Sequence, residues 1–155
     1  MSLCLSCGLC CDGTMFLVAA ITPSEAAKYA GRLDIAEDGK HLKLPCTALD
    51  GCKCTTYLDR PAVCAEFKCL ALASLELGTL TSAEAHEAIA EVLGRRQKVA
   101  DVVRVKDPRQ ALVLARRQAT DGTASEELRS ALTHLKQALL LMTLAPNDRI
   151  LRKAD

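Results

Sequence analysis

Large aromatic side chains and long apolar runs are scarce in this 155-residue sequence. It contains no tryptophan, two phenylalanines and two tyrosines, although half of its residues are hydrophobic. A core must therefore be packed mainly from leucine, valine and alanine. No apolar run approaches the roughly 20 residues of a transmembrane helix, and Cys4 follows Met1 too closely for a secretory signal. We therefore expect a cytoplasmic protein with reduced thiols.

A surplus of charge of either sign is also absent. Twenty basic and nineteen acidic residues give a formal net charge of +1. The basic pairs Arg95-Arg96 and Arg116-Arg117 have acidic residues interleaved around them, which is typical of solvated helix faces. The sequence thus lacks the basic footprint of a protein that binds nucleic acid or an anionic membrane, and we expect neither partner.

Cysteine is absent from the second half of the chain and abundant in the first. All nine lie between Cys4 and Cys69, and four of them fall within the eight residues CLSCGLCC. An odd number of cysteines in a cytoplasmic chain argues against a disulfide framework. The overlapping CxxC pairs lie in no strand-helix-strand pattern, which argues against a redox dithiol. Metal ligation is therefore the favoured use of these thiols.

The spacing of the cysteines leaves the kind of metal centre open. A structural zinc takes four ligands, often as two short-spaced pairs, and Cys4 and Cys7 form one such pair. Cys10 and Cys11 are adjacent, so their side chains tend to diverge and suit two metals, or one ligand and one bridge. Eight thiolates would serve two mononuclear zinc sites or one cluster, and nine would suit a three-metal cluster.

An iron–sulfur centre competes with zinc. Cys4, Cys7 and Cys10 match the first three positions of the bacterial ferredoxin spacing, but Thr14 stands where the fourth cysteine belongs. A ferredoxin is therefore disfavoured, and another iron–sulfur arrangement stays open.

Local patterns predict short elements around the cysteines. We expect a tight loop over 4–11, a buried strand over 14–21 and a helix that Thr22, Pro23 and Glu25 begin through a capping box. An Asp-Gly turn at 38–39 and an alternating strand over 41–44 should follow. Further on we expect a strand over 52–57 and one helix, capped by Asp59, that carries Cys64 and Cys69 to about residue 77.

The second half predicts three helices, which begin near residues 82, 108 and 126. The last has one apolar stripe, formed by Leu128, Leu132, Leu135, Leu139 and Met142. We expect that stripe to be buried within the chain, with a homodimer seam as the alternative. The fold expected is α-rich, small α+β: a cysteine-rich module over 1–75, followed by a three-helix layer over 76–155.

Several non-cysteine residues lie among the thiols in sequence. Arg60 is expected to offset the charge of a thiolate cluster, with a surface salt bridge to Asp59 or Glu66 as the alternative. Tyr57 and Phe67 are expected to pack as core residues over the metal site. With so many thiols present, His41 is expected on an exposed strand and not as a ligand.

The ordered motifs C-x2-C-G-x-C-C, C-x2-L and C-x2-Y-x2-R-P-x2-C-x2-F-x-C resemble the bacterial CxxCxxCC family of zinc- or iron-chelating domains. The resemblance extends from Cys4 to Cys69. It implies eight metal ligands: Cys4, Cys7, Cys10, Cys11, Cys46, Cys54, Cys64 and Cys69. Ala65 and Cys52 depart from the pattern, and Cys52 is an additional thiol. Flagellin lysine N-methylases look similar in the same region.

These observations predict a protein that chelates zinc, with two ions favoured, or iron, and that is not expected to be an enzyme. The alternative is an iron–sulfur protein with a redox role, or an accessory to protein lysine methylation. Metal ions are the partners that the sequence predicts, with a homodimer through the last helix as a possibility.

Overall fold

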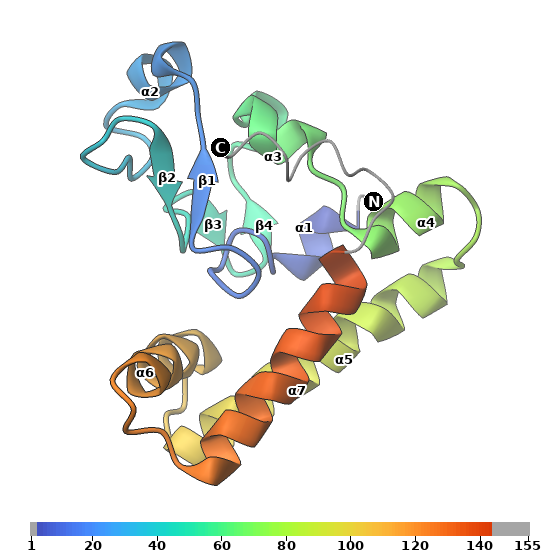
Figure 1. Cartoon of the computed structure of the whole chain (residues 1–155). Helices are drawn as coiled ribbons and strands as arrows, with labels where there is room; N and C mark the ends of the chain where they lie inside the picture. Colours follow the sequence, from blue (N-terminus) through green and yellow to red (C-terminus); the bar gives the residue numbers. More distant parts are fainter. Residues whose placement is uncertain (1–2, 144–155) are drawn as a thin grey trace. The chain divides into compact units, whose positions relative to one another are not determined.

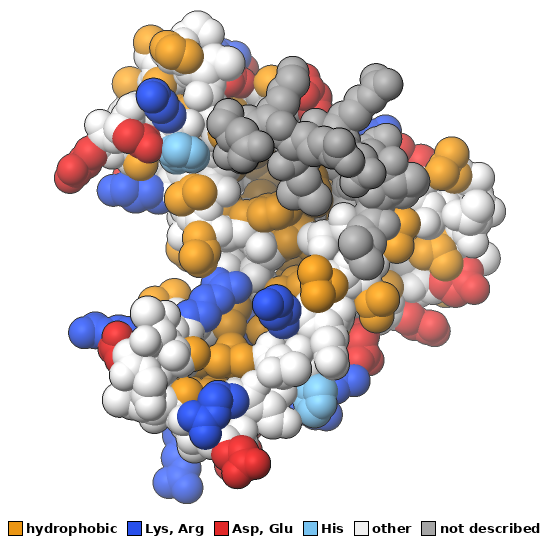
Figure 2. All heavy atoms as spheres, in the orientation of Figure 1, with side chains coloured by type: hydrophobic (Ala, Val, Ile, Leu, Met, Phe, Trp, Pro, Cys, Tyr) orange, Lys and Arg blue, Asp and Glu red, His pale blue; other side chains and the backbone are white. Residues whose placement is uncertain are grey.

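The structure, a computed structural model, describes residues 3–143 and divides into two compact units, residues 1–67 and 68–155 (Figure 1). Short helices and two small sheets make up the first unit, and helices make up the described part of the second. The expected α-rich, small α+β fold is confirmed. Basic and acidic side chains both occur on each unit on the face drawn in Figure 2.

The first cysteines lie on a helical turn, where a loop was expected. Helix α1 spans Cys4–Cys7 and ends at Gly8, whose φ is +72°. The carbonyl of Gly8 then accepts hydrogen bonds from the amides of Cys11 and Asp12, both at 2.9 Å. The loop prediction was wrong because glycine at the fifth position closes a single helical turn through a left-handed C-cap.

The first sheet is smaller and more exposed than expected. Strand β1 (Val18–Ala20) pairs antiparallel with β2 (His41–Lys43), with Ala19 opposite Leu42. Val18 is 51% exposed and Leu17 before it is 60% exposed. The strand predicted over 14–21 is therefore confirmed only over 18–20, and its predicted burial was wrong, because a sheet of two strands leaves much of its surface uncovered.

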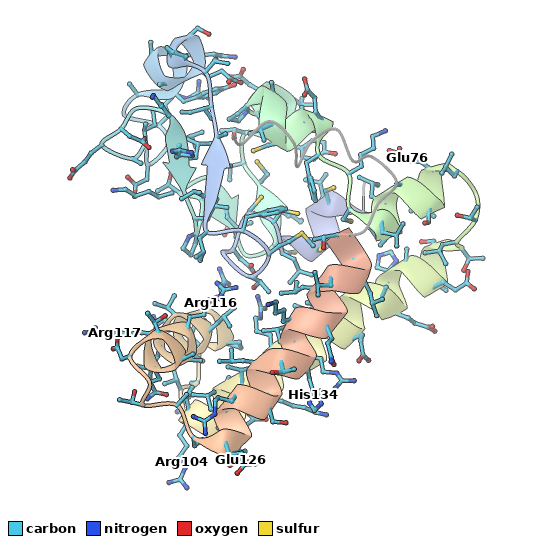
Figure 3. The ribbon with its side chains drawn as sticks, in the orientation of Figure 1. Glu76, Arg104, Arg116, Arg117, Glu126 and His134 are labelled. Carbon is cyan, nitrogen blue, oxygen red and sulfur yellow. The ribbon has the colours of Figure 1, made fainter. Side chains whose placement is uncertain are left out.

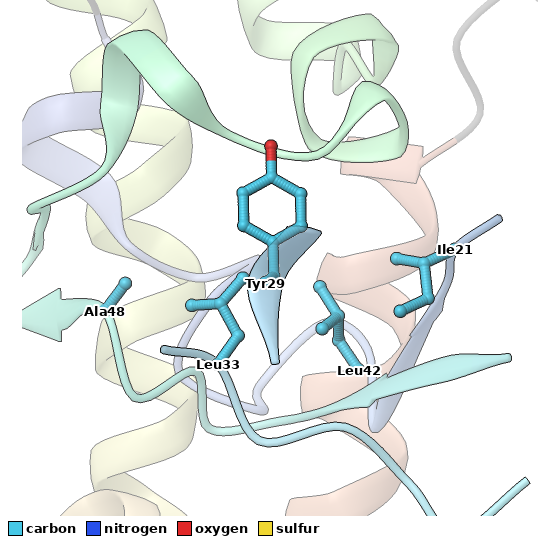
Figure 4. Packing of buried hydrophobic residues seen from close by; sticks show 5 residues of the cluster. All are labelled: Ile21, Tyr29, Leu33, Leu42 and Ala48. Atoms are coloured by element: carbon cyan, nitrogen blue, oxygen red, sulfur yellow. The ribbon is translucent and has the colours of Figure 1, made fainter. Parts of the chain in front are cut away.

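Helix α2 (Pro23–Tyr29) begins as predicted. The Thr22 hydroxyl accepts a hydrogen bond from the Glu25 amide, and the Glu25 carboxylate accepts one from the Thr22 amide. The helix packs its last residue, Tyr29, into a small apolar cluster (Figure 4). The buried members of that cluster are Ile21, Tyr29, Leu33, Leu42 and Ala48.

The second sheet is a short hairpin of β3 (Leu49–Asp50) and β4 (Lys53–Cys54), with Leu49 opposite Cys54. The 3₁₀ helix η1 (Tyr57–Asp59) follows. The expected strand over 52–57 is therefore shortened at both ends. Cys52 lies in the hairpin turn, beside Gly51 with a φ of +60°.

Two helices replace the single helix expected after Asp59. Helix α3 (Ala62–Glu66) ends at Phe67, whose backbone is extended, and Cys69 stands at the N-cap position of α4 (Leu70–Glu76) without a side-chain cap hydrogen bond. Asp59 does not cap α3, whose N-cap is Pro61. Cys64 and Cys69 therefore belong to different helices and to different units.

The helical unit follows the sequence closely. Helix α5 (Ser82–Val103) starts at a capping box of Thr81 and Glu84, and Asp107 caps α6 (Pro108–Thr120). Helix α5 packs against α6 and against α7 (Glu126–Thr143). No helix among residues 3–143 is long and apolar enough to cross a membrane.

The stripe on α7 is largely covered within the unit. Leu128, Leu135 and Met142 are each less than 5% exposed, and Leu132 and Leu139 are half-buried. This burial supports the expectation that the stripe packs inside the chain, while the homodimer stays a prediction. The expected helix end at Pro146 and the tail after it lie outside the described residues.

Candidate metal centre

Four thiols from separate segments of the first unit lie close enough to influence one another electrostatically. They are Cys11, Cys46, Cys54 and Cys64, and we call them the four-thiol group. The backbone ties two of them together, since the Cys46 amide donates to the Cys11 carbonyl at 2.7 Å. Figure 3 shows sulfur atoms gathered among α1, β4 and α3. The fold thus joins thiols that lie up to 53 positions apart in sequence.

The environment of this group raises the pKa of three of its members, Cys11, Cys46 and Cys64. Burial is the largest cause that raises the pKa of Cys11 to about 12, and the nearby thiols of Cys54, Cys46 and Cys64 raise it further. Burial first, then Cys46 and Cys54, raises the pKa of Cys64 to about 11. Cys64 is nevertheless exposed as a whole residue. Such mutual repulsion of thiolates is what a bound cation would relieve.

Arg60 positions the segment that carries Cys64. Its Nε donates to the Cys64 carbonyl at 3.2 Å, a second guanidinium nitrogen donates to the Tyr57 carbonyl, and its charge lies 3.9 Å from the Tyr57 ring centroid. That charge also lowers the pKa of the Cys64 thiol, against the larger effect of burial. Arg60 therefore combines the expected charge compensation with a structural role. Asp59, the alternative partner expected for Arg60, forms ion pairs with Lys28 and Arg32.

Helix α2 holds the same segment from the other side. The Glu25 carboxylate, already bonded to Thr22, accepts a hydrogen bond from the Ala62 amide at 2.7 Å, at the start of α3. Hydrogen bonds from the Thr22 and Ala62 amides lower the pKa of Glu25. The Asp59 carboxylate binds Lys28 and Arg32 of the α2 region. These contacts attach η1 and α3, and hence Cys64, to the apolar cluster under α2.

The other thiols surround α1 or lie beyond the first unit. Cys4 and Cys7 begin and end α1, and the Cys10 sulfur lies 3.5 Å from the Met15 sulfur. The Cys52 sulfur lies 3.6 Å from the carbonyl oxygen of Leu5. Cys69 belongs to the second unit. None of the nine cysteines, all of which fall within residues 3–143, forms a disulfide.

The donor set fits a thiophilic metal. Within residues 3–143, no three histidine, cysteine or acidic side chains are already drawn together at the spacing of a metal site. The four-thiol group nevertheless offers four sulfur donors and no competing imidazole, which is the ligand set of a structural zinc or an iron–sulfur centre. Binding would require these side chains to close around the ion.

A comparison with protein families gives the same chemistry. Residues 3–91, more than half of the chain, match the family model "CxxCxxCC: Putative zinc- or iron-chelating domain". The chain belongs to the CxxCxxCC family. No curated protein and no solved structure matches it. The description of the family as a zinc- or iron-chelating domain agrees with metal binding by this CxxCxxCC domain.

The aromatic residues and His41 of this CxxCxxCC domain make packing and ion-pair contacts. Phe67 is half-buried and packs edge-on against Phe16, with ring centroids 5.0 Å apart. Tyr57 is half-buried beneath Arg60. His41 lies on β2, as expected, and its Nδ1 lies 2.6 Å from the Asp38 carboxylate.

Two acidic residues were overlooked as parts of the centre. Asp12 is 6% exposed beside Cys11, and its carboxylate accepts a hydrogen bond from the Thr14 amide. Glu25 was predicted as a cap, but its contact with Ala62 crosses 37 positions. The position of Asp12 directly after Cys10-Cys11 can be read from the sequence. No local sequence pattern predicts the contact between Glu25 and Ala62.

Arg60 permits a test of geometry against charge. We expect Arg60→Lys to weaken metal binding by about tenfold, because lysine keeps the charge but cannot bond two carbonyls and stack on Tyr57 together. Competition titration with a chromophoric chelator measures this change. Lys43→Arg, on the exposed pair with Asp34, serves as the control. Wild-type affinity in Arg60→Lys would mean that charge alone matters.

Proposed function

We propose that this protein is a zinc-binding module in which metal–thiolate sites hold the cysteine-rich unit together. One zinc would be held by Cys11, Cys46, Cys54 and Cys64. A second would be held by Cys4, Cys7, Cys10 and one further thiol, which is Cys69 in the family pattern. The observation that carries the proposal is the convergence of four thiols from the turn after α1, the segment after β2, β4 and α3.

The surroundings of the four-thiol group favour a site that holds metal firmly. The Arg60 guanidinium donates a hydrogen bond to the Cys64 carbonyl, and the Glu25 carboxylate accepts one from the Ala62 amide. Asp59, which precedes α3, forms an ion pair with Lys28. The apolar cluster nearby has only five buried members, so metal ligation would supply cohesion that this small core lacks. Zinc suits such a role, because it is redox-inert and accepts four thiolates in a closed tetrahedral site.

The proton balance of binding tests this proposal. A cysteine binds zinc as thiolate, and the raised pKa values of Cys11, Cys46 and Cys64 keep these three groups protonated at neutral pH. Zinc binding at pH 7 should therefore release about three or more protons per ion at this site. Because protons compete with the metal, affinity should fall steeply as the pH is lowered. Calorimetry in buffers of different ionisation enthalpy counts the protons.

The matched variant for this experiment is Cys11→Ser. It should bind about one zinc fewer per chain and release correspondingly fewer protons. Metal and sulfide analysis of protein purified without air distinguishes zinc from an iron–sulfur centre. A wild-type chain that binds neither zinc nor iron, or a Cys11→Ser chain with unchanged stoichiometry, would refute the proposed site.

A further inference from the structure

We propose that Cys52, the thiol outside the family pattern, is a metal ligand beside Cys4 and Cys7. This inference rests on the proposed thiolate function and deepens it, because it names the fourth donor of the second site. The first observation is a contact: the Cys52 sulfur lies 3.6 Å from the carbonyl oxygen of Leu5. Leu5 lies between the two cysteines of α1, so Cys52 is seated on the helical turn that carries them.

The backbone of Cys52 packs closely against Gly8, the residue that ends α1. A Cβ atom at Gly8 would lie 3.1 Å from the Cys52 Cα and 3.3 Å from its carbonyl oxygen. Strand β4, which follows Cys52 directly, also contacts α1. Cys52 is half-buried. Main-chain packing therefore holds the backbone of Cys52 beside the end of α1.

The α1 turn supplies partners at suitable spacing. Residues three apart on a helix lie on the same face, so Cys4 and Cys7 can be reached together from one side. Cys10 follows within the turn that folds back on the Gly8 carbonyl. With Cys52, these residues make a second set of four thiols, and both sets then lie within residues 1–67.

The hairpin β3–β4 explains how Cys52 and Cys54 can serve different sites. Cys54 lies in the strand and influences Cys11, Cys46 and Cys64 electrostatically. Cys52 lies in the turn, where the alternation of a strand no longer applies. The hairpin presents one thiol to the four-thiol group and the other to α1.

The test compares Cys52→Ser with Cys69→Ser in the full-length chain. Zinc per chain is measured by native mass spectrometry, and the Co²⁺-loaded proteins are measured by visible absorption. We expect Cys52→Ser to lose one zinc, or to bind it at least about tenfold more weakly, with a Co²⁺ spectrum of reduced sulfur ligation. Cys69→Ser should keep both ions. Cys52→His is the second variant, because zinc accepts imidazole: it should regain the second ion with an altered Co²⁺ spectrum.

The other outcomes separate the inference from the function on which it rests. Two zinc ions and an unchanged Co²⁺ spectrum in Cys52→Ser, with a loss in Cys69→Ser, would overturn the inference in favour of Cys69. A wild-type chain with a single zinc that Cys11→Ser removes would overturn it and leave the proposed function standing. If Cys52→Ser loses both ions, recovery in Cys52→His supports ligation and failure to recover refutes it. A wild-type chain without metal refutes the proposed function itself.

Discussion

Removal of the metal should unfold residues 1–67 and leave the helices of residues 68–143 folded. The first unit has a small apolar cluster of five buried residues and strands of two or three residues. Binding of a structural zinc contributes about 10–16 kcal/mol to the folding of such modules, which is comparable to the roughly 5–15 kcal/mol by which a whole domain is usually stable. Hydrogen exchange with and without a strong chelator measures the effect for each segment.

The helical unit has its own core and should keep its protection. Its buried residues come from α4–α7 and include Ala85, Ile89, Val92, Val99, Leu112, Leu128, Leu135 and Met142. Leu135→Ala is the reverse control: a cavity there should cost about 2–4 kcal/mol without lowering the metal content. Unchanged protection of residues 14–67 after verified removal of metal would show that the first unit does not need it.

Gly8→Ala should destabilise the first unit more than Gly31→Ala does. Both glycines have nearly the same φ, +72° and +73°, and alanine in the left-handed region costs about 1–2 kcal/mol. Only Gly8 faces the Cys52 backbone, at 3.1 Å from where the Cβ would lie, whereas nothing lies within 4 Å at Gly31. In Gly8→Ala, crowding of the new methyl group against the Cys52 backbone should add about 1–3 kcal/mol to the loss of stability.

The difference between the two variants isolates the contact between α1 and Cys52. Zinc content and chemical denaturation of both proteins measure it, and Gly8→Ala should also lose metal because the Cys52 hairpin turn is displaced from α1. Equal loss of stability in the two variants would mean that φ alone matters at Gly8.

Interactions within about four residues were predictable from the sequence. Thr22 and Glu25 form the expected capping box, and a second box of Thr81 and Glu84 stands at the expected start of α5, because a cap joins a side chain to an amide three positions away. The long helices of the second unit follow from similar signals and from apolar periodicity. The ordered cysteine motif was sufficient to indicate the CxxCxxCC family.

Short elements were predicted less well, because few local interactions determine them. The CLSC segment could be a loop or a turn of helix, and a left-handed Gly8 made it α1. The stretch after Pro61 could continue as one helix, yet an extended Phe67 separates α3 from α4. That residue packs edge-on against Phe16, a contact across 51 positions that no local pattern contains.

The sequence by itself determined the donor type, the helical content of the second half and the family. Which thiols meet was decided by tertiary structure alone. Cys11 and Cys64 influence each other because separate segments converge, and Cys52 reaches α1 because Gly8 lacks a side chain. The physical reason is range: capping and periodicity act within a few residues, whereas a four-ligand site needs groups brought together by packing of the whole unit.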